Sequence, residues 1–251
     1  MTQQNPFLGV WQRSYIRFDN GPCETRQTVL WIQAETLFAD VRSSLGKTPL
    51  TPETYRQLGW QDAFSSYAGF SGTFSWHPID DPGSEPEGEQ KAHCQWHHDI
   101  SIFPPGGADE GECHWLTPDS FIELGICLDH QGQTHTYEER WQRLSKARSK
   151  IFELQVDQQR GRCLLAAGWA IVVHDWRPAK ADLLSDSSTF SAFSATAWQS
   201  KGALWIPRFS TQPLLGTRPF WTPAQILKSS DWQILQPPRG APTTQRLLSY
   251  Y

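Results

Sequence analysis

Alternating apolar and polar positions recur along the first part of the chain and predict β-strands. In the clearest run, Cys94, Trp96, His98, Ile100 and Ile102 share one face, which we expect to point inward, and polar residues share the other. The same reading predicts further strands at 10–18, 26–34, 38–42, 70–76, 112–116, 121–128 and 134–144. A run of about eight strands with short connections predicts an up-and-down antiparallel barrel.

One interval breaks this pattern and predicts a helix. Thr51 can serve as an N-cap, Pro52 suits the first helical position, and Tyr55 and Leu58 follow at helical spacing. We therefore expect one helix near 51–67, inserted into the barrel and able to act as a lid over its mouth.

A charged stretch at 146–150 ends the first pattern, and strand signals resume at 151–156, 163–167 and 169–176. The sequence thus predicts two domains. Residues 1–146 form the barrel, and residues 147–251 form a second, smaller β-rich, barrel-like domain.

Composition strengthens the all-β assignment and narrows the function classes. The chain holds 13 Trp, 13 Phe and 6 Tyr beside 18 Gly and 18 Pro, as is typical of strands joined by turns. Its net charge is -4 and no block of Lys or Arg occurs, which argues against nucleic-acid binding. No signal peptide and no membrane-spanning apolar run is visible, so we expect a cytoplasmic protein without a membrane span.

Cysteines and histidines give no metal or cofactor signature. The five cysteines form an odd, widely spaced set, which favours free thiols over a disulfide framework. Seven of the eight histidines fall between His77 and His135, but without the paired spacing of a zinc site. We therefore predict no metal site, and the cofactor stays unknown.

Gly9-Val10-Trp11 matches the Gly-x-Trp signature of lipocalins, in which the Trp plugs one end of the barrel. A basic residue on the last strand, Arg140 or Arg143, would lie across the Trp11 indole in a cation–π contact. The alternative is a chance match in a Trp-rich chain.

Longer matches resemble the Hri-type family of fungal and bacterial proteins. They are Trp11-Gln12-Arg13 with Ile16, Trp31-Ile32-Gln33, Phe38-Ala39-Asp40-Val41-Arg42, Gly69-Phe70 with Gly72, His98-Asp99-Ile100 and Glu139 with Trp141. The resemblance covers the first 145 residues and extends loosely over the rest. It implies two lipocalin-like (calycin) domains in tandem, with no assigned reaction or ligand. The acidic loop at 80–90 departs from the family pattern.

Polar residues on inward faces are the candidates for ligand contacts. Asp40 and Arg42 either position a ligand inside the barrel as an ion pair or form an exposed or rim salt bridge. His98 either contacts a ligand, or a metal, or is a core histidine satisfied by a neighbour. Glu138 and Glu139 face opposite sides, so the inward one needs a partner such as Arg13 or Arg42. The full predicted ligand set is Trp31, Asp40, Arg42, Phe74, Trp96, His98 and Glu139.

The leading interpretation is a non-enzymatic protein that binds a small apolar or aromatic ligand inside the first barrel. If side chains fill the barrel, the alternative is a protein–protein interaction module using aromatics such as Trp205, Phe220 and Trp221. A third interpretation is a small calycin-type enzyme with His98 and a carboxylate as acid and base. No familiar catalytic motif supports this third interpretation.

Overall fold

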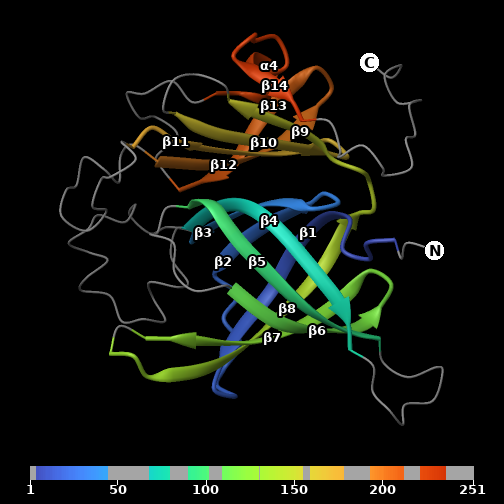
Figure 1. Cartoon of the computed structure of the whole chain (residues 1–251), viewed down its shortest axis with the longest axis vertical. Coiled ribbons are helices and arrows are strands. Elements are labelled where there is room, and N and C mark those ends of the chain that lie inside the picture. Colours follow the sequence, from blue (N-terminus) through green and yellow to red (C-terminus); the bar gives the residue numbers. More distant parts are fainter. Residues whose placement is uncertain are drawn as a thin grey trace.

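The computed structural model describes residues 4–44, 68–79, 90–101, 109–129, 131–154, 159–177, 193–211 and 221–235. These residues form an all-β protein in two layers, a barrel and a sheet that lies over one side of it (Figure 1). The barrel strands are β1 (Gly9–Phe18), β2 (Gln27–Gln33), β3 (Leu37–Ser44), β4 (Ala68–Pro78), β5 (Lys91–Ser101), β6 (Asp109–Thr117), β7 (Ser120–Leu128) and β8 (Thr134–Ser145).

The first eight strands form a closed antiparallel barrel, which confirms the predicted lipocalin-like architecture. Each strand pairs with the next along the chain, and β8 returns to pair with β1. The predicted helix near 51–67 lies outside the described residues.

The second unit is a six-stranded sheet of order β13-β12-β11-β10-β9-β14. Its elements are β9 (Lys150–Leu154), β10 (Arg160–Ala166), β11 (Trp169–Asp175), β12 (Phe193–Lys201), β13 (Leu204–Ser210), the short α4 (Pro223–Ile226) and β14 (Trp232–Ile234). Thr222 and Gln225 form a capping box that starts α4. Within the described ranges, no helix has the length and apolar character needed to cross a membrane.

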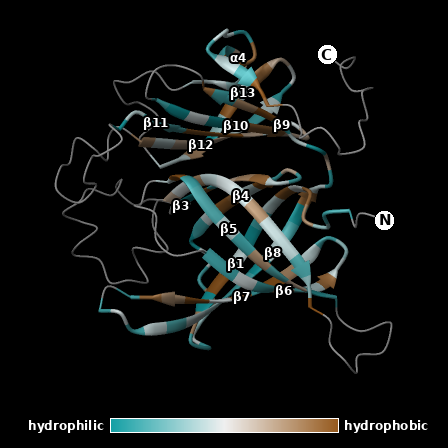
Figure 2. Cartoon of the chain, viewed as in Figure 1, coloured by the Kyte–Doolittle hydropathy of each residue, from teal (hydrophilic) through white to brown (hydrophobic). Residues whose placement is uncertain are grey.

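One face of this sheet and the outer wall of the barrel share a hydrophobic core. Val10, Leu30 and Val41 of the barrel pack with Leu164 and Ile171 of the sheet, all nearly or fully buried. Figure 2 shows hydrophobic stretches on strands of both units. The barrel therefore buries apolar side chains on both of its surfaces.

Strand β5 corrects one prediction about this wall. Cys94 and Trp96 point into the barrel as expected, but Ile100 packs in the outer core beneath the sheet. The register passes from Gly72 opposite His98 to Ser71 opposite Ile100, so Asp99 is an extra, bulged residue. A bulge reverses the alternation of faces, which is why Ile100 points outward.

The closed end of the barrel is a plug around Trp11. The Arg143 guanidinium lies 4.3 Å above the Trp11 ring, and Arg143 also donates to the carbonyl oxygen of Leu8 at 2.9 Å. Arg140 instead is exposed to solvent. Gly9 has φ +131°, and a Cβ there would lie 2.1 Å from the Ser145 carbonyl oxygen, so this position requires glycine.

Candidate functional site

Aromatic rings fill the centre of the barrel. Trp31 lies among the rings of Trp11, Phe74, Trp96 and Trp141, at centroid distances between 5.5 and 6.1 Å. Such stacked and edge-to-face pairs stabilise a core beyond the area they bury. Phe74, predicted as a ligand contact, belongs to this packed centre.

Buried charges lie beyond the aromatic centre, inside the same barrel. Arg13 donates to Glu139 and to Gln27, and the side chains of Arg13 and Glu139 are each only 1% exposed. Arg42 approaches the same Glu139 carboxylate at 3.6 Å. The inward residue of the Glu138–Glu139 pair is therefore Glu139, and both expected arginines contact it. One of its oxygens, Oε2, is buried without a hydrogen-bond partner among the described residues.

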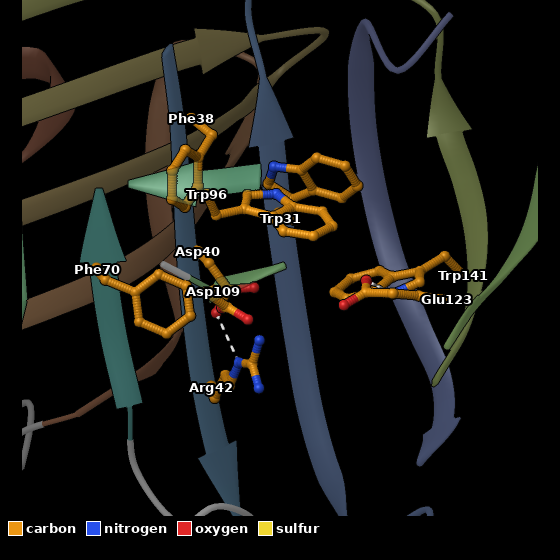
Figure 3. A pocket seen from close by; sticks show the side chains of 9 residues that line it. All are labelled: Trp31, Phe38, Asp40, Arg42, Phe70, Trp96, Asp109, Glu123 and Trp141. Carbon is orange, nitrogen blue, oxygen red and sulfur yellow. Dashed lines mark hydrogen bonds and ion pairs between the residues drawn. The ribbon is translucent and has the colours of Figure 1, made fainter. Parts of the chain in front are cut away.

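Asp40 and Arg42 form an ion pair at 3.0 Å inside the barrel (Figure 3). The exposed salt bridge that we considered at these positions is wrong, because both side chains are at least nine-tenths buried. Burial raises the pKa of Asp40, with Arg42 opposing that shift. The pKa of Arg42 is raised, since the attraction of Asp40 and Glu139 outweighs burial.

Glu123 is a third buried carboxyl group in this cluster. It accepts hydrogen bonds from the Tyr137 hydroxyl at 3.1 Å and from the Trp141 indole at 3.0 Å. Burial, followed by the charges of Glu139 and Asp109, raises the pKa of Glu123 well above its usual range.

His98 lies at the rim of this cluster. Its ring stacks on Phe70 at a centroid distance of 4.2 Å, and its Nε2 lies 3.4 Å from an Asp109 carboxylate oxygen. The His98 side chain is 23% exposed, so it is not the buried imidazole that the sequence predicts. The enzyme interpretation, with His98 and a carboxylate as acid and base, rests on this geometry alone.

A cavity inside the barrel is lined by four of the seven predicted ligand residues. Trp31, Asp40, Arg42 and Trp96 line it, whereas Phe74, His98 and Glu139 are not among its lining residues. The sequence analysis missed five further lining residues: Phe38, Phe70, Asp109, Glu123 and Trp141 (Figure 3). The alternation of inward and outward residues along β7 could have identified one of them, Glu123, because it shares the inward face of Phe121.

The cavity is very small. Its volume is about 20 Å³, which is room for about one water molecule. Ligand pockets usually reach ~300 Å³ or more. This cavity is therefore too small for an organic ligand.

A larger hollow lies outside the barrel, in a groove between the barrel and the second sheet. Its volume is about 280 Å³. Leu30 and Leu144 line it from the barrel, and Trp169, Pro207 and Phe209 line it from β11 and β13. Three polar residues of the barrel wall, Gln12, Thr28 and Ser43, complete this side of the groove.

Apolar side chains remain exposed around the groove. Leu144 is 41% exposed on the barrel side. On the sheet side, Gln199 pairs with both Trp169 and Ile206, which places Ile206 on the same face as Trp169. Ile206 is 37% exposed. The groove was not predicted, although Leu144 is an apolar residue among the outward-facing, otherwise polar residues of β8.

The aromatics predicted for a protein interface lie elsewhere. Trp205 and Trp221 pack against the core on the outer face of the second sheet, and Phe220 lies outside the described residues. All five cysteines are free thiols. In the ranges that the structure covers, no three His, Cys, Asp or Glu side chains gather as they would around a metal ion.

Comparisons with known proteins agree with this architecture. The chain is similar to the uncharacterized protein YLR301w from Saccharomyces cerevisiae, whose crystal structure superposes with a TM-score of 0.60 at 12% identity. The match covers 90% of this chain and 97% of that chain, so the two share a fold. No curated protein matches. The profile of the family described as Protein HRI1 matches residues 9–225, which include all eight barrel strands and the sheet strands β9 to β13. The chain therefore belongs to the HRI1 protein family.

Proposed function

We propose that this protein is a non-enzymatic binding protein for a small apolar or aromatic molecule. The ligand lies in the groove between the barrel and the second sheet. One observation carries this proposal: the groove measures about 280 Å³, whereas the cavity lined by Trp31, Asp40 and Arg42 inside the barrel measures about 20 Å³. A groove of this size is close to the lower end of small-molecule sites.

The walls of the groove suit such a ligand. Trp169 and Phe209 offer aromatic surface, and Leu144 faces them from β8 with much of its side chain in water. A bound ring would remove this apolar surface from solvent, which is favourable. Both walls belong to a shared core, so the groove is preformed and little binding energy goes into ordering it.

Naphthalene-1-carboxamide, an uncharged aromatic probe, tests the proposal. Binding is measured by isothermal titration calorimetry and by ligand-observed NMR. We expect the wild-type protein to bind it and Ser43→Phe, which fills the groove, to lose most of the affinity. Ser75→Phe is the matched control, because Ser75 is exposed on the outer face of β4 and does not line the groove.

Equal binding by the wild type and Ser43→Phe would place the ligand elsewhere. In that case, loss of binding in Trp96→Leu would point to the barrel interior, which would have to open around the small cavity. No binding to any variant would contradict a small aromatic ligand.

A protein partner is the second candidate, favoured by a different observation. Leu124, Ile126 and Leu128 form an apolar stripe along the outer face of β7, and Ile126 and Leu128 are 66% and 68% exposed. The far end of β7 is accordingly coloured as hydrophobic in Figure 2. If a second copy of this chain covers the stripe, sedimentation velocity would show a dimer that Ile126→Lys abolishes.

A further inference from the structure

One of the described residues that line the groove is charged, and a β-bulge places it there. Across β12 and β13, Trp198 pairs with Pro207, but the neighbouring Ala197 pairs with Phe209. Arg208 is therefore an extra residue between the two pairs. A bulge re-aims the side chain that it inserts, and Arg208 lines the rim of the groove from this position.

Arg208 differs from most arginines of this protein. Eight described arginines pair with a carboxylate, both inside the barrel and across the two units. Among the residues that the structure describes, Arg208 makes no such pair, and no Asp or Glu lines the groove. The described lining thus has one positive charge and no negative one.

We propose that the ligand of this groove is a small aromatic anion whose carboxylate pairs with Arg208. This inference rests on the proposed function and adds the chemical class of the ligand. The ring lies between the Trp169–Phe209 wall and Leu144. The carboxylate sits at the rim, where a guanidinium matches it with two parallel N–H donors.

The polar residues of the barrel wall fit the same ligand. Thr28 and Ser43 are cross-strand partners, so their hydroxyl groups lie side by side on the outer face of β2 and β3. Gln12 adds an amide from β1. All three donate hydrogen bonds and carry no charge, so they can support a carboxylate at the rim without repelling it.

Three probes that share one ring and differ in charge separate this inference from the proposed function. They are naphthalene-1-carboxylate, naphthalene-1-carboxamide and 1-naphthylmethylammonium, each titrated calorimetrically into the full chain at low and high salt. We expect the carboxylate to bind about fivefold more tightly than the amide, and the ammonium to bind most weakly. The advantage of the carboxylate shrinks as salt is raised, because ions screen an exposed pair.

Arg208→Gln identifies the side chain responsible. This variant should bind the carboxylate and the amide with similar affinity, while its affinity for the amide stays at the wild-type value. Arg208→Lys keeps the charge and should retain part of the preference. Arg140→Gln is the matched control, because Arg140 is exposed on β8 and does not line the groove.

The outcomes are distinct. Binding of all three probes with equal affinity, or an unchanged preference in Arg208→Gln, overturns the anion inference and leaves the binding function standing. Failure of all three probes to bind overturns both. A preference for the ammonium would also refute the inference.

Discussion

Glu139 is the carboxylate that Arg13 and Arg42 share inside the barrel. It contacts Arg13 and lies 3.6 Å from Arg42, while Asp40 supports only Arg42. Charges taken out of water need close partners, and removing one partner leaves the other charge buried without compensation. The stability of the barrel should therefore depend strongly on Glu139.

The substitution Glu139→Gln should lower the free energy of unfolding by about 3 kcal/mol, because Arg13 loses its carboxylate partner. Urea unfolding followed by circular dichroism measures the change. Glu138→Gln is the neighbouring control, since Glu138 pairs with the partly exposed Arg17 and should lose less than about 1 kcal/mol. Similar losses in both variants would contradict the account of a charge cluster held by Glu139.

His174 gives the second sheet a pH dependence. Its ring is buried, both ring nitrogens lack hydrogen-bond partners among the described residues, and burial lowers its pKa from 6.5 to about 4. The folded protein therefore holds His174 neutral at a pH at which the unfolded chain protonates it. The stability that it contributes is fully present above pH 6.5 and falls as the pH drops toward 4.

When the pH is lowered from about 7.5 to about 5.5, the free energy of unfolding of the wild type should fall by about 1 kcal/mol more than that of His174→Gln. The comparison uses the change with pH in each protein, so a constant loss of stability in the variant does not matter. His135, whose pKa is raised by its hydrogen bond to Asp19, is present in both proteins and cancels. Parallel pH profiles would show that His174 is not held neutral.

At the scale of the elements, the barrel depends on how its two end strands meet. Trp11 on β1 pairs with Arg143 on β8, so the cation lies directly over the indole that plugs the barrel. Arg143 also donates to the carbonyl oxygens of Leu8, Pro6 and Pro118. One guanidinium thus ties the segment before β1 and the β6–β7 turn to the last strand.

Replacing Arg143 with Lys keeps the charge but removes the planar fork that makes these contacts. We expect Arg143→Lys to lower the free energy of unfolding by about 2 kcal/mol, since buried carbonyl oxygens lose their donors. Arg140→Lys, at an exposed position of the same strand, should change it by less than about 0.5 kcal/mol. Thermal and urea unfolding of the two variants provide the test, and an unaffected Arg143→Lys would show that the fork is dispensable.

The sequence predicts strands well because alternation is local, and it fails where a bulge interrupts the alternation. Trp31, Asp40, Arg42 and Trp96, which the sequence proposes as ligand contacts, line one cavity inside the barrel, and their role in binding stays a prediction. Ile100 is assigned to the wrong face because Asp99 is bulged. Gly72 is the residue in the sequence that indicates this bulge, since a Cβ at this position would lie 1.7 Å from the His97 carbonyl oxygen.

The groove could not be predicted in this way. Its two walls come from strands more than 20 residues apart in the sequence, and they meet only because the second sheet packs on the barrel. The alternation of apolar and polar residues does not identify Arg208, because its place at the rim depends on the register between β12 and β13. Alternation within one strand carries no information on how two sheets pack.

At the scale of the whole molecule, the second sheet covers a wall of the barrel that is too apolar to face water. Val10, Leu30, Ile32 and Val41 point out of the barrel into the shared core, each 2% exposed or less. On the polar side of the same interface, Arg162 of β10 donates to Ser71 and lies 3.3 Å from Asp99. We therefore propose that the two units form one cooperative structure, although strand pairing separates them into two parts.

A fragment of residues 1–146 tests this proposal. Without the second sheet it would expose the apolar wall, so we expect it to aggregate in size-exclusion chromatography. The same fragment carrying Ile32→Thr and Val41→Lys should remain monomeric and keep the β signal in circular dichroism. A monomeric, cooperatively melting wild-type fragment would instead show that the barrel is an independent domain. Because the fragment lacks the Trp169–Phe209 wall, even its soluble form should not bind naphthalene-1-carboxylate, which would separate the barrel fold from the binding function.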